Sequence, residues 1–367
     1  MGKRYKRRVE NQVYEYYWDL TMAWTNFNGY KFCEALKITI DFIDNNKDDY
    51  SPEVYEKLQE KISTCLNIDK TSTRKGINEL VKLGFINPRL KSYHSLSKEY
   101  LQTDDNENRK LLLSKIVYSN ASFQRSVTKE SNTREINFLV KTIEAQKGIN
   151  EKYLGTIISI KTNDYPAGYI TKNELEQLFR SEKQSEFEKR KYNQIGYLSG
   201  LLKKLDGIVF KDDAFYLKKD SNNIQSDDEQ ISQEMKGRDP YLQRIYKHQL
   251  EQESLSILGN VKCMVEKLSY PVLIASHIKP FRYSDEKEAF DPNNGLLLSK
   301  TLDSLFDLNY ISFSDDGNII FYNRVSEDVK EFWKNYKLDE KFINSDRLLY
   351  LKYHRDLCEK KNNCLNN

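Results

Sequence analysis

Apolar residues repeat at helical spacing in two neighbouring stretches of the front half of the chain. The first stretch, residues 51–62, begins with Ser-Pro, which favours a helix start because serine caps the first turn and proline fits its first position. Its apolar positions recur every four residues: Val54, Leu58 and Ile62. The second stretch, residues 71–83, is apolar at Ile77, Leu80 and Val81. We expect two helices joined by a short turn.

The second of these helices is expected to expose a polar face. Four residues share that face: Arg74, Lys75, Asn78 and Lys82. Gly84 ends the helix, and Phe85 and Ile86 then precede an Asn-Pro turn and a basic stretch, which predicts a short hairpin. Helix, turn, polar-faced helix and hairpin follow one another in the order of a winged-helix module.

The same order is predicted between residues 171 and 218. Thr171 and Glu174 fit a capping box at the start of one helix. A second helix is expected over about residues 190–205, with an apolar side formed by Ile195, Leu198 and Leu202. Its exposed side is expected to show Arg190, Gln194 and Tyr197. Residues 208–217 then place a polar turn between two apolar runs, which predicts a hairpin.

The two units resemble tandem winged-helix DNA-binding modules, in which the second helix enters the major groove and the hairpin contacts phosphates. We therefore assign residues 1–105 and 106–218 to two winged-helix-like domains with double-stranded DNA as their partner. Arginine and asparagine on an exposed helix can pair with base edges. The candidate DNA-binding residues are Arg74, Lys75, Asn78, Lys82, Arg190, Gln194 and Tyr197. Winged helices also serve as protein-interaction modules or spacers, and both alternatives stay open.

Residues 219–238 contain only three large apolar residues and predict a linker. Residues 1–218 carry 37 Lys and Arg against 30 Asp and Glu, a net of +7, whereas residues 239–367 carry 18 against 20, a net of -2. A basic front suits a polyanion-binding part, and an acidic back suits a part that needs carboxylates. Chance variation explains the modest difference equally well.

Apolar runs and cysteines exclude several classes of protein. The chain has no apolar stretch of about 18 residues, and its basic start is not followed by an apolar segment, so a cytoplasmic protein without membrane partners is expected. The five cysteines are scattered, and none forms a CxxC pair. This spacing favours neither a disulfide framework nor a four-thiolate zinc site.

The candidate catalytic and metal-binding residues lie between positions 270 and 320. An apolar strand over residues 272–275 leads to His277, and a second apolar strand over residues 296–298 leads to a helix that starts near Ser299. On that helix Asp303 and Asp307 lie four residues apart and share one face. Two strands and a helix are thus expected to bring one histidine and two carboxylates toward each other.

Such a trio can hydrolyse a phosphodiester. A histidine with a pKa near neutral can accept a proton from the attacking water, while a divalent ion neutralises the charge that develops on the phosphate oxygens. Two aspartate carboxylates favour a hard, hydrated ion. The expected cofactor is therefore Mg²⁺, with Mn²⁺ as its substitute.

The segments ASHIKP, DPNNGLLLS, LDSLFD and ISFSDDGNI together resemble the HNH endonuclease family, whose fold is the ββα-metal finger. The resemblance implies that His277 is the general base, that Asn294 fixes the loop, and that Asp303 and Asp307 bind the metal. His354 and Arg355 recur in similar proteins, but their spacing supplies no mechanism. We assign residues 239–367 to the nuclease domain. The expected fold is therefore α+β and multi-domain, with a mostly helical front and a C-terminal HNH domain.

Two departures from the family pattern alter these expectations. Many members place a further Asp or His ligand where this chain has Ser276, so two side chains plus water are expected to hold the ion here. Many members also use two CxxC pairs to bind a structural zinc. Because this chain has no such pair, no structural zinc is expected.

A winged-helix-like front joined to an HNH domain resembles a type II restriction endonuclease that cuts at a distance from its recognition sequence. Because each finger cuts one strand, we expect a monomer or a transient homodimer on DNA, with a methyltransferase as a possible partner system. The alternatives are a methylation-dependent HNH endonuclease and a DNA-binding regulator with an inactive finger. A secreted nuclease toxin is less favoured.

Overall fold

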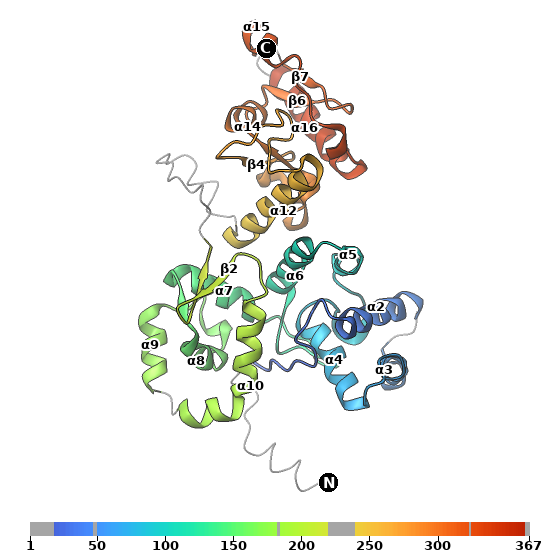
Figure 1. Ribbon diagram of the computed structural model, residues 1–367, viewed down its shortest axis with the longest axis vertical. Helices are drawn as coiled ribbons and strands as arrows, with labels where there is room; N and C mark the ends of the chain where they lie inside the picture. Colours follow the sequence, from blue (N-terminus) through green and yellow to red (C-terminus); the bar gives the residue numbers. More distant parts are fainter. Residues whose placement is uncertain (1–17, 47–49, 182–183, 219–238, 323, 364–367) are drawn as a thin grey trace. The chain divides into compact units, whose positions relative to one another are not determined.

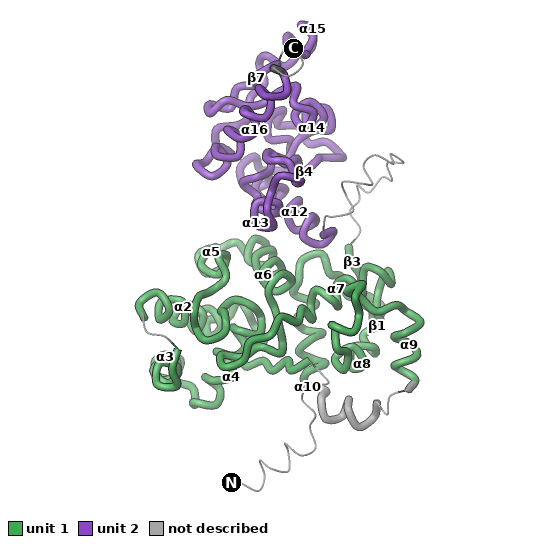
Figure 2. The backbone as a smooth tube through the Cα atoms, turned by 180° about the vertical axis from the view of Figure 1, so that it is seen from behind, with its two compact units in different colours: residues 1–219 green, residues 220–367 purple. Residues whose placement is uncertain are grey.

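The computed structural model describes residues 18–46, 50–181, 184–218, 239–322 and 324–363. The chain divides into two compact units, residues 1–219 and residues 220–367 (Figure 2). No helix within the described ranges is long and apolar enough to cross a membrane. The predicted linker at residues 219–238 lies outside the described residues.

The described part of unit 1 is mostly helical, with one small sheet (Figure 1). Its helices are α2 (Tyr30–Asn45), α3 (Pro52–Leu66), α4 (Lys70–Lys82), α5 (Ser97–Gln102), α6 (Asn106–Asn120), α7 (Glu135–Gln146), α8 (Leu154–Ile158), α9 (Lys172–Ser181) and α10 (Gln184–Leu202). The antiparallel sheet has the order β1–β3–β2 and consists of β1 (Ile149–Asn150), β2 (Ile208–Lys211) and β3 (Ala214–Leu217).

Several predicted local signals are confirmed in unit 1. The hydroxyl of Ser51 accepts a hydrogen bond from the Val54 amide at 3.2 Å, so serine caps α3. Thr171 and Glu174 form a capping box, since each side chain accepts from the backbone amide of the other at 3.4 and 3.0 Å. The hairpin β2–β3 closes through Asp212 and Asp213, whose φ values of 49° and 55° are those of a two-residue turn.

The first predicted hairpin is reduced to a single bridge. Ile86 pairs with Tyr93, and a 3-10 helix (Pro88–Leu90) occupies the residues between them. Pro88 has no amide hydrogen, and the amide of Arg89 donates to the carbonyl of Val127 at 2.7 Å. The backbone groups that would extend a hairpin are therefore missing or bonded elsewhere.

The two halves of unit 1 share one core. The Trp18 ring packs against Phe123 and Phe138, at centroid distances of 6.1 and 6.4 Å, and its indole N–H donates to the carbonyl of Ile160 at 2.9 Å. Lys204, just after α10, donates to the carbonyl of Thr25. Segments on both sides of residue 105 are thus packed together.

Unit 2 contains two small antiparallel sheets and five helices among its described residues. The sheets pair β4 (Ile274–His277) with β5 (Gly295–Leu298) and β6 (Ile311–Phe313) with β7 (Ile319–Phe321). The helices are α12 (Pro240–Leu258), α13 (Glu286–Ala289), α14 (Lys300–Asp307), α15 (Glu327–Trp333) and α16 (Ser345–Asn363).

His354 of α16 is a core residue of unit 2. Its ring stacks on Phe306 at a centroid distance of 3.9 Å, and its Nε2 donates to the Phe306 carbonyl at 3.2 Å. Its Nδ1 is 2.9 Å from the hydroxyl of Ser312 in β6. Burial lowers the pKa of His354 from 6.5 to about 4. This histidine therefore links α14, α16 and β6 as a neutral ring.

We expect the stability of unit 2 to depend on the protonation of His354. Because the unfolded histidine binds a proton more readily than the folded one, this contribution is complete above pH 6.5 and is lost as the pH falls toward 4. The loss is about 2 kcal/mol by about pH 5. Hydrogen exchange of α16 amides, corrected for intrinsic rates, measures this loss as a function of pH. Protection should fall between pH 6.5 and pH 5 in the wild type but not in His354→Gln, which has no imidazole to protonate. Parallel pH profiles would contradict the assignment.

Candidate active site

The strands β4 and β5 and the helix α14 form a compact ββα arrangement. Antiparallel pairing places His277 opposite Gly295. The Ser299 hydroxyl accepts from the Leu302 amide at 3.4 Å and caps α14 directly after β5. Leu302 and Phe306 are fully buried, so this side of the helix packs inward. Asp303 and Asp307 each follow one of these buried residues; Asp303 is half-buried and Asp307 is exposed.

Asn294 fixes the loop between the two strands. Its buried side-chain oxygen accepts from the Lys279 amide at 2.6 Å, and its side-chain nitrogen lies 3.2 Å from the Lys279 carbonyl and 2.9 Å from the Glu288 carbonyl. A third acceptor for this nitrogen, the Ser284 hydroxyl, lies at 3.3 Å. One side-chain amide at the end of the loop thus provides hydrogen-bond partners for the backbone of Lys279, at its start, and for the Glu288 carbonyl.

His277 is buried on the side of the sheet that α12 covers. Its ring stacks on Tyr246 at a centroid distance of 4.7 Å, and 9% of the residue is exposed. Its Nε2 lies 2.9 Å from the carbonyl of Ala289. Because a carbonyl oxygen can only accept, Nε2 bears a proton, and Nδ1 is the ring nitrogen that would be unprotonated in the neutral form of the ring. The tautomer is therefore fixed by the loop.

Asp303 lies on the other side of the sheet, beside Ser276. Burial raises the pKa of Asp303 to about 6; the nearby Ser276 hydroxyl opposes this shift, and the negative charge of Asp307 adds to it. Ser276 is 2% exposed, and its hydroxyl makes no hydrogen bond of normal geometry with the described residues, although it is close enough to Asp303 to lower that pKa. Asp307 is exposed.

The expectation that His277 faces the two carboxylates directly stays a prediction, and the contacts around β4 favour a different placement. Adjacent residues of a strand point to opposite faces of the sheet. Ser276 points toward Asp303, so His277 points toward Tyr246. Gly295, opposite His277, supports this placement, because a Cβ at that position would collide with the Tyr246 hydroxyl. The histidine and the carboxylates flank β4 from opposite sides.

The oxygen donors near Asp303 fit a hard divalent ion with few protein ligands. Among the described residues, no group of three or more His, Cys, Asp or Glu side chains is arranged to hold a metal. Asp303 and Asp307 lie on one side of α14, and the buried Ser276 hydroxyl adds a third oxygen. Oxygen donors of this kind suit Mg²⁺, which retains several waters. The residues present fit such an ion.

Several supporting residues of the site were not anticipated from the sequence. Arg347 of α16 is fully buried, makes two hydrogen bonds of 2.9 and 2.8 Å to the Glu253 carboxylate, and donates to the Pro292 carbonyl at 3.0 Å. Lys279 forms an ion pair of 2.6 Å with Glu288. The partners are far apart in the chain and follow no motif, so only the fold reveals them.

The candidate DNA-binding residues of α4 divide into two groups. Arg74 and Lys75 are exposed, as expected. Asn78 is half-buried, and its side chain donates to the Arg74 carbonyl at 2.8 Å and accepts from the Val127 amide at 2.9 Å. Lys82 is 4% exposed and forms an ion pair of 2.8 Å with Asp19. The exposed face of α4 is therefore narrower than predicted.

The candidates on α10 also differ from expectation. Gln194 is buried beside Leu198 and Leu202, which are fully buried as predicted, whereas the predicted inward residue Ile195 is only half-buried. Tyr197 is half-buried. Arg190 lies in α10, but its side chain is outside the part of the chain whose side chains are described.

Comparison with known families agrees with the ββα geometry. Residues 263–314 match the family model of HNH endonucleases. Unit 2 contains an HNH endonuclease domain. The matched segment includes β4, β5, α14 and β6 and thus all four predicted site residues. An HNH domain implies a DNA substrate and a general dependence on divalent metal ions. No curated protein was found to match the chain.

We expect Asp303→Asn to stabilise unit 2 while abolishing cleavage. Above pH 6 the folded state holds a carboxylate that burial disfavours, and asparagine removes this penalty of about 1–3 kcal/mol. The gain disappears as the pH falls toward 3.8, where the carboxyl is neutral in both states. The exposed Asp307 is the matched control, since Asp307→Asn should change stability by less than about 0.5 kcal/mol. Urea unfolding of the two variants and the wild type, above pH 6 and near pH 3.8, measures these changes in the free energy of unfolding.

We expect Asn294→Ala to destabilise the loop between β4 and β5. Removal of a buried amide leaves the Lys279 amide and the Glu288 carbonyl without their partner, which costs about 2–4 kcal/mol. Hydrogen exchange at the Lys279 amide should accelerate strongly. Asn293→Ala, which alters the neighbouring and less buried amide, should leave that exchange rate nearly unchanged. Equal effects of the two substitutions on that exchange rate would argue against this role of Asn294.

Proposed function

We propose that this protein is a type II restriction endonuclease that hydrolyses double-stranded DNA at or near a specific sequence. The observation that carries the proposal is the half-buried carboxylate of Asp303, which lies beside Ser276. Asp303 belongs to α14, and this helix flanks β4, the strand that ends in His277. This arrangement lies within the segment that matches HNH endonucleases.

The proposed chemistry assigns one task to each side of β4. On one side, Asp303, Asp307 and the Ser276 hydroxyl would hold Mg²⁺, with Mn²⁺ as a substitute. When bound, the ion would neutralise negative charge on the phosphate. On the other side, His277 would act in its neutral form, and its Nδ1 would accept the proton of the attacking water. Asn294 fixes the loop whose Ala289 carbonyl sets this tautomer.

A substrate phosphate must therefore lie across the end of β4. The Cα atoms of Ser276 and His277 are separated by one peptide unit, about 3.8 Å. A group at the strand end can thus contact both sides, although the two side chains point apart. The stacking of His277 on Tyr246 restricts the orientation of the ring.

Unit 1 is proposed to bind double-stranded DNA through the exposed Arg74 and Lys75 of α4 and through the β2–β3 hairpin. Cleavage at a distance from the recognised sequence would follow from two units joined by the segment predicted to be a linker. The protein would act as a monomer or as a transient dimer on DNA, alongside a methyltransferase that protects the same sequence.

A second candidate function is a DNA-binding regulator with an inactive finger. Two observations favour it: His277 is largely buried, and the described residues include no group of three or more side chains arranged for a metal. The two functions predict different outcomes when the protein meets DNA and a divalent ion.

Incubation of a sequenced plasmid with the protein and Mg²⁺ or Mn²⁺ tests the nuclease function. We expect discrete fragments whose mapped ends give the cut position, and none in the presence of EDTA. His277→Ala should lower the rate by at least about a hundredfold while retaining DNA binding. His248→Ala removes an imidazole elsewhere in unit 2 and serves as the matched control. Binding without cleavage by the wild type would instead support the regulator, and fragments from methylated plasmid alone would indicate methylation dependence.

A further inference from the structure

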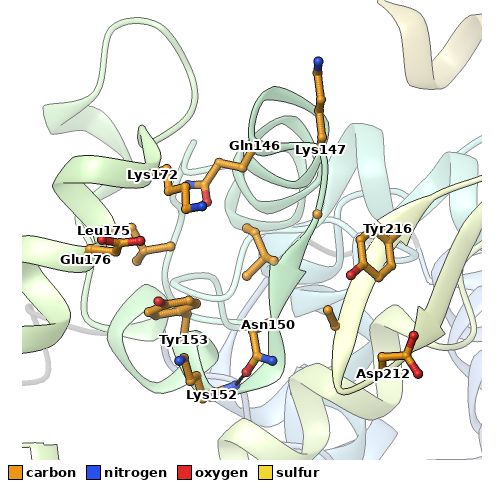
Figure 3. A pocket seen from close by; sticks show the side chains of 13 residues that line it. Gln146, Lys147, Asn150, Lys152, Tyr153, Lys172, Leu175, Glu176, Asp212 and Tyr216 are labelled. Atoms are coloured by element: carbon orange, nitrogen blue, oxygen red, sulfur yellow. Dashed lines mark hydrogen bonds between the residues drawn. The ribbon is translucent and has the colours of Figure 1, made fainter.

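Unit 1 contains a cavity of about 340 Å³ beside the β2–β3 hairpin (Figure 3). Its lining comes from the end of α7, from β1 and the 3-10 helix η3 (Glu151–Tyr153), from the first turns of α9, and from the hairpin. This volume falls in the range of small-molecule sites, about 300–1,000 Å³. None of the candidate DNA-binding residues of α4 and α10 lines it.

The cavity combines an apolar floor with aromatic side walls. Ile149, Leu175 and Ala214 are buried lining residues. Figure 3 shows Tyr153 and Tyr216 on opposite sides of Asn150. A flat heterocycle suits these walls, since every nucleobase can stack on a tyrosine ring.

Tyr216 is held in place as a stacking surface. Gly148 has a φ of 128°, a conformation open to glycine, and a Cβ there would collide with the Tyr216 ring. The ring therefore lies directly against the backbone of Gly148. Yet 39% of Tyr216 remains exposed. A ring packed on one side and open on the other loses little entropy when a base stacks on it.

Two side-chain amides give the cavity directional hydrogen-bonding groups. The Asn150 oxygen accepts from the Lys152 amide at 3.1 Å, while its NH₂ group has no acceptor among the described residues. The Gln146 nitrogen donates to the Ile170 carbonyl at 2.9 Å, which leaves the Gln146 oxygen as an acceptor. One oriented donor and one oriented acceptor are the groups that bind the edge of a base.

Five charged side chains line the cavity: Lys147, Lys152, Lys172, Glu176 and Asp212. None of the three lysines forms an ion pair with a described residue, and Lys152 Nζ lies 5.0 Å from the centroid of the Tyr153 ring. The nearby Glu176 is paired with Arg180 at 3.6 Å. Figure 3 shows Lys147 pointing away from the other side chains, so Lys172 and Lys152 are better placed to meet a phosphate.

We propose that this cavity binds a single nucleotide, with its base against Tyr216 and its phosphate near Lys172. The nucleotide could be free in solution, or it could be one residue of DNA turned out of the duplex. The DNA source rests on the proposed function of unit 1, and it is the one we favour because the cavity adjoins the hairpin proposed to contact phosphates. It would make an extruded base part of sequence recognition.

The test measures binding of two fluorescent probes to the full chain in EDTA, where cleavage cannot occur. The probes are 2-aminopurine deoxyribonucleoside monophosphate and a DNA duplex with one unpaired 2-aminopurine; a fully paired duplex is the reference. We expect quenching of at least one of the two probes, because the base stacks on tyrosine. Quenching of the mononucleotide alone identifies a free nucleotide. Tighter binding of the unpaired than of the paired duplex identifies DNA.

Three variants distinguish binding in the cavity from nonspecific electrostatic binding of DNA. Tyr216→Leu keeps an apolar contact with Gly148 but should weaken binding about tenfold. Lys172→Gln, on an exposed helix position, should weaken it several-fold at low salt. Lys61→Gln removes an exposed charge from α3 and should change it less than about twofold.

Wild-type affinity in both cavity variants, or quenching of neither probe, overturns the proposal. Thermal unfolding of Tyr216→Leu and Lys172→Gln checks that both fold. Plasmid cleavage by the wild type is measured separately, so loss of nucleotide binding and failure of the nuclease proposal give different results.

Discussion

One buried side-chain amide organises the HNH domain. Asn294 bonds to both backbone groups of Lys279 and to the carbonyl of Glu288, so it fastens the two ends of the loop that connects β4 to β5. The same loop presents the Ala289 carbonyl to His277. Because these groups are removed from water, each bond within this network depends on the others. The loop therefore acts as one rigid body that orients the imidazole.

The two-stranded sheet separates the chemistry into two environments. On the α12 side, the Tyr246 ring and the Ala289 carbonyl hold the ring of His277. On the α14 side, burial raises the pKa of Asp303 because it disfavours the charged carboxylate. A bound cation would offset this cost of burying the charge. Arg347 ties α16 to α12 through Glu253 and to the loop through the Pro292 carbonyl. The rest of unit 2 thus supports the end of one short strand.

The local patterns succeeded where a residue acts through its immediate neighbours. The caps at Ser51 and Thr171 and the turn at residues 212–213 depend on backbone groups within about four positions, and all three form as predicted. The pattern failed for Lys82 and Gln194. Both lie on helices whose buried stripe is set by segments distant in the chain, including Asp19 in the case of Lys82.

Strand pleat and helix pitch act over a few residues, so the order of two strands and a helix around His277, Asn294, Asp303 and Asp307 could be predicted from the residue pattern. The side of β4 that each group occupies could not be predicted in this way. Tyr246, Ser276 and Arg347 make that choice through contacts between elements far apart in the chain. Such contacts depend on which elements pack together, and periodicity along one chain does not specify that.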